Sequence, residues 1–351
     1  MSEPAALMRE SLGRAAVAGS QTHAQLSFYG LGISVSGNWP QVISDLAQDF
    51  AWFKDGVAEP PRVVVTIERR LPEFEAAGNR VASFVTPRNV VYHHGELTII
   101  DYFGKALSLY DRRQERLVIQ GEDRDLVHEA AYHFVLSRVG AHLETVGLCR
   151  LHALGLAGRD GAVAVLLPSG GGKSTLALTA LSKDGVRLLS EDSPVVDRHG
   201  RVHPFPLRLG VNPGDAGRLP PGDTRTVNRM EFAPKTLLEL DAFAERIEPV
   251  AQPLRHLVIG RRTLGTHAVL EPVARHTAIG PLLRECVVGV GLYQGMEFIL
   301  QRGVRDVLGK LGPASVRVRC CTAVLARAQT WDMRLGRDHE ANWRALSSLL
   351  H

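Results

Sequence analysis

Residues 163–189 read VAVLLPSGGGKSTLALTALSKDGVRLL, and this stretch decides the fold class. Its first five residues are all apolar, which is typical of a strand that is buried on both faces of a sheet. Next comes Ser169-Gly170-Gly171-Gly172-Lys173-Ser174-Thr175, then a run with helix composition to Leu181 and a second apolar run at Val186 to Leu189. Strand, glycine turn, helix and strand in this order predict a β-α-β unit in an α/β domain.

The glycine turn predicts a phosphate-binding loop. Three successive glycines have no Cβ, so their N–H groups can form one concave nest, and the start of the following helix adds further donors. Lys173 would place its charge on the β- and γ-phosphates, and the Ser174 hydroxyl would ligate Mg²⁺. A full Walker A motif has a glycine six residues before the lysine, where this chain has Leu167. The alternative interpretation is an ordinary glycine turn.

The second apolar run ends in two adjacent carboxylates, Glu191 and Asp192. The carboxyl end of a strand beside a phosphate loop is where a Walker B ligand for Mg²⁺ belongs. We expect Asp192 to ligate the metal and Glu191 to act as the general base for an attacking hydroxyl. The alternative is that both carboxylates are a solvated strand end.

The remaining chain divides into segments that differ in composition and in the spacing of their apolar residues. Residues 1–22 resemble a tail, and residues 23–124 predict a strand-rich α+β domain, with a strand between 26 and 35, a helix over 39–53 and a strand at 63–67. Residues 125–150 predict a connecting helix, 151–312 the phosphate-loop domain and 313–351 a basic helical segment. Arg198-His199-Gly200 lies between two short apolar runs and predicts a hairpin.

Composition excludes several classes of protein. Hydrophobic residues make up 45% and charged residues 22% of the 351 residues, as in ordinary globular chains. The net charge of +4 is too weak a field to indicate binding to nucleic acid or a membrane. Four cysteines without CxxC spacing and the absence of a long apolar run favour a cytoplasmic protein. The oligomeric state, a homo-oligomer included, stays open.

Several of these residues together resemble a known family. His152 precedes Lys173 by 21 residues, and the pattern continues through Ser169 to Ser174, Glu191-Asp192 and the stretch His203 to Arg208. This order is similar to that of the HPr kinase/phosphorylase family of P-loop kinases, which is akin in structure to phosphoenolpyruvate carboxykinase. The chain resembles most its relatives in peptide-modification pathways, such as the lasso-peptide precursor kinases. The resemblance implies an α/β P-loop kinase core of the HPr kinase/phosphoenolpyruvate carboxykinase type with an N-terminal strand-rich α+β domain.

The chain departs from the family pattern at three points. Leu167 stands in place of the first loop glycine, and Glu191 in place of the aspartate that the family uses as base. The C-terminal arginine and glycine signature of true HPr kinases is missing. The reverse phosphorylase reaction and the HPr substrate are therefore not expected.

The resemblance implies an ATP- and Mg²⁺-dependent kinase that transfers the γ-phosphoryl group to a hydroxyl, on a serine of a small protein or precursor peptide. It places His152 near the transferred group, and Arg208 is a candidate clamp for a phosphate. Neither an LSGGQ-like signature nor an NKxD motif is present, which disfavours a transport ATPase and a GTPase. Two alternatives stay open: a nucleotide-binding regulatory module that hydrolyses ATP slowly, and a kinase that acts on a small-molecule hydroxyl.

Overall fold

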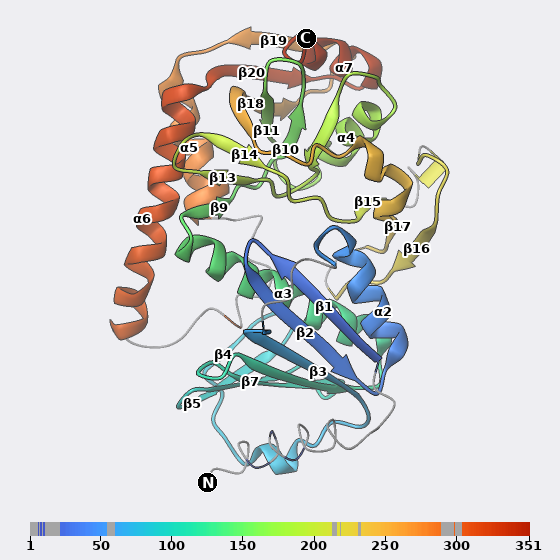
Figure 1. The fold of residues 1–351 in the computed structure, drawn as a ribbon, viewed down its shortest axis with the longest axis vertical. Helices are drawn as coiled ribbons and strands as arrows, with labels where there is room; N and C mark the ends of the chain where they lie inside the picture. The colour runs from blue at the N-terminus through green and yellow to red at the C-terminus, as the bar shows by residue number, and fades with distance from the viewer. Residues whose placement is uncertain are drawn as a thin grey trace. The chain divides into compact units, whose positions relative to one another are not determined.

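A computed structural model of the chain shows two compact units, drawn as a ribbon in Figure 1. The first comprises Met1–Val139, Thr226–Lys235 and Gln294–Asp306, and the second comprises Gly140–Arg225, Thr236–Tyr293 and Val307–His351. The structure describes residues 6, 8, 10, 22–54, 60–212, 216–217, 219–230, 233–288, 298 and 304–351. The tail expected over 1–22 lies outside the described residues except at positions 6, 8, 10 and 22.

The first unit is built on an eight-stranded sheet with the strand order β1-β2-β3-β8-β7-β6-β5-β4. The strands are β1 (Thr22–Phe28), β2 (Leu31–Gly37), β3 (Val63–Arg69), β4 (Phe84–Val85), β5 (Val90–His94), β6 (Leu97–Asp101), β7 (Ala106–Asp111) and β8 (Arg116–Gly121). Helix α2 (Pro40–Asp49) connects β2 to its parallel neighbour β3, as such a pair requires. Short 3₁₀ turns lie at Ala51–Phe53 and Glu75–Ala77.

The elements predicted in the first unit are confirmed, with one difference. The single strand expected between residues 26 and 35 is a hairpin of β1 and β2. Tyr29 and Gly30 form its turn with φ of 51° and 87°. Positive φ at both central residues matches the twist of a two-residue hairpin. The sequence conceals this turn because only one of the two positions is a glycine.

Helix α3 (Arg124–Thr145) occupies most of the region that was expected to be a connecting helix. The boundary between the two units, after Val139, falls within this helix. The last residues of the expected helix form strand β9 (Leu148–Arg150) instead. Gly147, with φ of 79°, separates the helix from the strand and explains the early end of the helix.

The second unit contains a nine-stranded mixed sheet. Its main path is β12-β10-β11-β18-β14-β13-β9, and β20 pairs with β18 and with β19. The strands are β10 (Leu154–Ala157), β11 (Ala162–Leu166), β12 (Arg187–Ser190), β13 (Val195–Asp197), β14 (Arg201–His203), β18 (Gln252–Arg262), β19 (Val269–Pro272) and β20 (Gln329–Leu335). The predicted hairpin around Gly200 is confirmed as β13 and β14.

The strand, glycine turn, helix and strand order is also confirmed, as β11, α4 (Lys173–Leu181) and β12. Figure 1 labels β11 and α4. The two strands are not direct neighbours, because β10 lies between them and runs antiparallel to both. On its other side β11 pairs in parallel with β18, and β18 pairs in parallel with β20. The glycine turn therefore leaves the carboxyl end of a strand in the interior of the sheet.

The other elements of the chain are short, apart from one helix. They are β15 (Leu209–Val211), β16 (Thr224–Val227), β17 (Lys235–Leu238), η4 (Leu240–Arg246), η5 (Arg275–Ala278), α5 (Ile279–Leu282), the π-helical η6 (Leu283–Val288), α6 (Val304–Arg327) and α7 (His339–Ser347). None of the helices in the described part of the chain has the length and apolar composition needed to cross a bilayer.

The expectation of a helical segment over 313–351 was wrong in part. Helices α6 and α7 lie in this region, but strand β20 lies between them and pairs with β18 over seven residues. Thr330, Met333 and Leu335 on this strand are buried. Because β20 is short and lies between two helices, the sequence of this region predicted only helix.

Candidate functional site

The glycine turn after β11 has the backbone that a phosphate nest requires. Gly170 and Gly172 have φ of 72° and 108°, in the left-handed region that favours glycine. A Cβ on Gly171 would lie 2.8 Å from the carbonyl oxygen of Pro168, whose oxygen accepts a hydrogen bond from the Gly171 N–H at 2.9 Å. Gly172 is the N-cap of α4, and no side chain caps this helix. The first N–H groups of α4 are therefore not used by a capping side chain.

Leu167, the departure from the Walker A pattern, has a packing role. Its side chain is 1% exposed and fills the space beside Gly260 on β18. A Cβ on Gly260 would come within 2.5 Å of the Leu167 Cδ2 atom. The position where other phosphate loops carry glycine is therefore part of the core here, and a glycine on the neighbouring strand makes room for it.

Lys173 begins α4 and turns back into the site. Its side chain is 6% exposed. Its Nζ atom lies 2.8 Å from the Leu167 carbonyl oxygen, 2.8 Å from His152 Nε2 and 3.4 Å from Asp192 Oδ1. An ammonium group has three N–H donors, so these three neighbours match its full capacity.

His152 lies between two carboxylates. Its Nδ1 atom is 2.6 Å from Glu285 Oε2, and its Nε2 atom is 3.2 Å from Asp192 Oδ1. The backbone holds both partners in place, because the His152 N–H donates to the Glu285 carbonyl at 3.1 Å and the Ala153 N–H donates to the Asp192 carbonyl at 3.1 Å. Asp192, two residues after β12, and Glu285, in η6, thus meet at the segment between β9 and β10.

The charge of His152 depends on these neighbours. Burial opposes its charged form, but the hydrogen bonds to Asp192 and Glu285 outweigh the burial and raise the pKa of His152 to about 9. Glu285 is buried as well, yet His152 and Arg284 hold its pKa below the usual range. The imidazole and the carboxylate therefore stabilise each other in their charged forms.

The position of Lys173 and the protonation of His152 are coupled. An ammonium group cannot accept a hydrogen bond, so the 2.8 Å contact of Lys173 with Nε2 is a hydrogen bond only to the neutral imidazole, with its proton on Nδ1 toward Glu285. With a pKa of about 9, this neutral ring is the minor form near neutral pH. An imidazolium would direct its Nε2–H to Asp192 and repel Lys173. Protonation of His152 therefore favours movement of Lys173 away from the histidine.

Ser174 and Glu191 form a second pair at the same turn. The Ser174 hydroxyl donates to Glu191 Oε1 at 2.5 Å. The sequence grouped Ser174 with Asp192 as metal ligands and reserved Glu191 for proton transfer. The structure brings Ser174 to Glu191, and it brings Asp192 to Lys173 and His152.

The other predicted site residues lie around this centre. Ser169 is exposed and Thr175 is half-buried, each at one end of the glycine turn. The Phe205 N–H donates to the Leu189 carbonyl at 2.8 Å, so the stretch that leads to Arg208 begins beside β12. Arg208 is half-buried, just before β15.

Sequence reasoning missed Glu285 and a small hollow beside the turn. Glu285 is 133 residues from His152 and belongs to no motif. The hollow brings Arg262 and His339 next to Gly171 and Gly172. No local pattern marks these residues, because only the pairing of β18 with β20 and the packing of α4 against α7 bring them together.

The oxygen atoms of Ser174 and Glu191 are the kind that Mg²⁺ prefers, and substrate phosphates usually complete such a site. Among the described residues, no three His, Cys, Asp or Glu side chains are grouped so that they alone could hold a metal.

No protein family matches this chain, and no curated protein is a significant match to it.

Proposed function

We propose that the protein is a kinase that uses ATP and Mg²⁺ and transfers the γ-phosphoryl group to a hydroxyl, on a serine of a small protein or precursor peptide. One observation carries the proposal: Lys173, Ser174, His152, Glu191 and Asp192 converge at a glycine turn with left-handed backbone. An ordinary glycine turn has no reason to collect two carboxylates, a lysine and a histidine.

The nucleotide phosphates would take the place of the present partners of Lys173. The N–H groups of Gly170 to Gly172 and of the first turn of α4 would bind the phosphate oxygens. Lys173 would leave His152 and place its ammonium on the β- and γ-phosphates. His152, freed from Lys173 and with its pKa raised to about 9, would carry a positive charge beside the transferred group.

The geometry favours roles for Glu191 and Asp192 that are the reverse of those expected from the sequence. Ser174 and Glu191, which share a hydrogen bond, would hold Mg²⁺. The metal would neutralise charge on the phosphates. Asp192, next to His152 and Lys173, would accept the proton of the acceptor hydroxyl.

Lys173→Ala and Lys183→Ala test the proposal as a pair. Lys183 lies just beyond α4 and contacts Glu340 at the surface, so its loss controls for the removal of a lysine near this helix. We expect Lys173→Ala to abolish phosphorylation of a peptide library that contains serine, and Lys183→Ala to retain it. Binding of Mg·ATP by calorimetry should follow the same order.

Three outcomes would contradict the proposal in different ways. Full activity of Lys173→Ala would remove this lysine from the mechanism. Absence of Mg·ATP binding in the unaltered protein would return the turn to a structural role. ATP hydrolysis that no peptide or small-molecule hydroxyl accelerates would favour a regulatory module that hydrolyses slowly.

A further inference from the structure

A second polar pocket lies at the opposite end of the strands that carry the glycine turn. His256 on β18 is in register with Val163 on β11 and with Gln329 on β20. The pocket is therefore at the amino ends of β11 and β20, beside residues 255–256 of β18, while the glycine turn follows the carboxyl end of β11. The five residues of β11 separate the two places by about 16 Å, at about 3.3 Å per residue.

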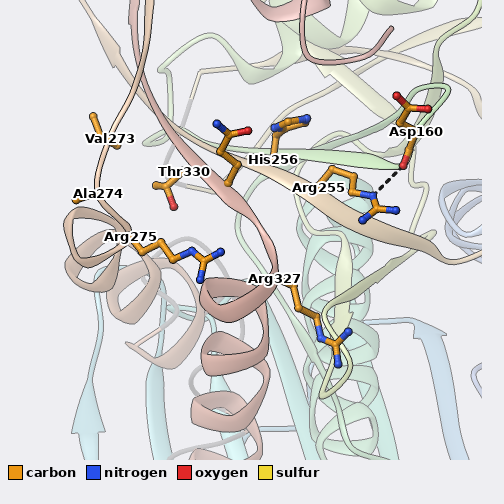
Figure 2. Close-up of a pocket in the computed structure, with 9 residues that line it drawn as sticks. Asp160, Arg255, His256, Val273, Ala274, Arg275, Arg327 and Thr330 are labelled. Atoms are coloured by element: carbon orange, nitrogen blue, oxygen red, sulfur yellow. Dashed lines mark hydrogen bonds between the residues drawn. The ribbon is translucent and has the colours of Figure 1, made fainter.

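The pocket has a volume of about 800 Å³ and is shown in Figure 2. This is within the range of pockets that hold small molecules, about 300–1,000 Å³. Its lining residues are Asp160, Arg255, His256, Val273, Ala274, Arg275, Arg327, Gln329 and Thr330. Three of them are arginines and one is acidic, so the pocket has a positive field.

Within the described part of the chain, no carboxylate pairs with these arginines. Among the described residues, no ion pair involves Arg255, Arg275 or Arg327. Arg255 donates to the backbone carbonyl of Asp160 at 3.0 Å. Arg327 ends α6, where a cation also stabilises the helix dipole. Arg255 lies on strand β18, and Arg275 belongs to the four-residue helix η5. Neither arginine therefore stabilises the dipole of a long helix.

Thr330 gives a second, independent indication of a ligand. Its side chain is 1% exposed, and its hydroxyl has no hydrogen-bond partner among the described residues. A buried hydroxyl without a partner is unfavourable, and such groups are rare in folded proteins. In Figure 2 this hydroxyl points toward the side of the pocket on which Arg275 lies.

His256 adds one more donor. Its Nδ1 atom accepts a hydrogen bond from Trp331 Nε1 at 3.1 Å, so the proton of the neutral ring is on Nε2. Burial and the neighbouring Arg255 lower the pKa of His256, which keeps the ring neutral at pH 7. The lining thus offers guanidinium, hydroxyl and imidazole donors.

We propose that this pocket binds a small molecule that carries at least two anionic groups, phosphate or carboxylate. The guanidinium group of arginine binds either a phosphate or a carboxylate with two parallel hydrogen bonds. The Thr330 hydroxyl would donate a hydrogen bond to the ligand. The inference does not depend on the kinase proposal, because none of the residues involved belongs to the glycine turn.

Calorimetric titration of the full chain with pyrophosphate and with citrate tests the site. The buffer should be low in chloride, because salt screens exposed charges. We expect the double variant Arg255→Gln/Arg275→Gln to bind the anion more weakly, with a loss of affinity of about tenfold for each arginine removed. Arg198→Gln, at an exposed arginine outside the pocket, should leave the affinity unchanged. Binding of pyrophosphate alone would identify a phosphate ligand, and binding of citrate alone a carboxylate ligand.

Pyrophosphate could also enter the glycine turn, so the titrations are repeated with Lys173→Ala. Binding that survives Lys173→Ala and falls in the arginine double variant supports the pocket. Binding that falls with Lys173→Ala and survives in the double variant would overturn it, as would no binding of either anion.

Thr330→Val gives a variant with nearly the same shape. Because the hydroxyl has no partner in the described residues, the melting temperature should not fall, while anion affinity should fall severalfold. Wild-type affinity in both Thr330→Val and the arginine double variant would overturn the proposal.

Discussion

At the scale of single residues, the site is organised around His152. One ring nitrogen faces Glu285 and the other faces both Asp192 and Lys173. These neighbours differ in exposure, since the side chains of Glu285 and Lys173 are buried and that of Asp192 is exposed. In the proposed kinase, the proton on the histidine would connect nucleotide binding, through Lys173, with proton transfer, through Asp192.

The roles proposed for Glu191 and Asp192 predict that their amide variants lose activity in different ways. Glu191→Gln should raise the Mg²⁺ concentration needed for half-maximal activity, because it removes the charged partner of Ser174. Asp192→Asn should bind Mg²⁺ normally and slow phosphoryl transfer about 10²-fold, near the lower end for a general base because a loose transition state needs little base assistance. Single-turnover transfer across a Mg²⁺ titration distinguishes them. The reverse pattern would return the base to Glu191.

Glu285→Gln should change the pH dependence of stability. The pKa of His152 in the folded chain, about 9, lies above its ordinary value of 6.5, so the imidazolium stabilises the fold fully below about pH 6.5. This contribution is lost as the pH rises through about 9. Loss of the Glu285 charge lowers the pKa of His152, so the fall in stability above about pH 6.5 should be smaller and should end at a lower pH.

Nuclear magnetic resonance titration of the His152 ring, assigned with His152→Asn, measures the pKa directly. Urea unfolding at several pH values measures the stability. Glu285→Asp keeps the charge and should retain part of the raised pKa. An unchanged His152 titration in Glu285→Gln would show that Asp192 alone accounts for the shift.

At the scale of elements, the site forms where one strand ends and one helix begins. β11 carries the glycine turn, and α4 begins with Lys173 and Ser174. β12, two places along the sheet, delivers Glu191 and Asp192 just after its last residue. β10 lies between them, and His152 precedes it by two residues. Three sheet neighbours thus supply the site from the same edge.

Gly170→Ala and Gly185→Ala form a matched pair at this scale. Both glycines have similar φ, 72° and 78°, and a Cβ at either would meet nothing within 4 Å. Each substitution should cost about 1–2 kcal/mol of stability from the left-handed backbone. Only Gly170→Ala lies in the phosphate nest, so only this variant should lose Mg·ATP affinity. Equal affinities in calorimetry, with similar melting temperatures, would argue against the nest.

At the scale of the whole molecule, the second unit contains every residue of the candidate site. Strand β20, near the end of the chain, is part of its sheet and pairs with the central strand β18 over seven residues. The Leu350 carbonyl accepts a hydrogen bond from the Arg159 N–H at 3.0 Å. The C-terminal residues are thus a structural part of this unit.

A chain that ends at Arg327 should therefore lose the folded second unit. Without β20, residues 256–262 of β18 lose their parallel partner, and the buried backbone groups there lose their hydrogen bonds. We expect loss of Mg·ATP binding and of the cooperative melting transition, measured by calorimetry and circular dichroism. A chain that ends at Leu350, which lacks only the exposed His351, should behave as the full chain. Wild-type binding by the shorter chain would show that β20 is dispensable.

The sequence by itself determined the local elements and the chemical character of the site. Apolar runs and the glycine turn were sufficient for β11, α4 and β12, because spacing and backbone conformation are local properties. The residue types of the turn and of the carboxylate pair also followed from the sequence. In the structure, Lys173, His152 and Asp192 lie together.

The tertiary structure decided the partners. Which carboxylate contacts Ser174, and that Glu285 contacts His152, depends on how β10, β12 and η6 pack, and chain distance gives no information about it. The same holds for β20, whose seven residues between two helices become a strand because β18 offers a free side with backbone hydrogen bonds to be satisfied. It also holds for Leu167, whose place in the core depends on the absence of a side chain at Gly260 on another strand. Each of these contacts joins residues far apart in the chain, so only the packed fold could specify it.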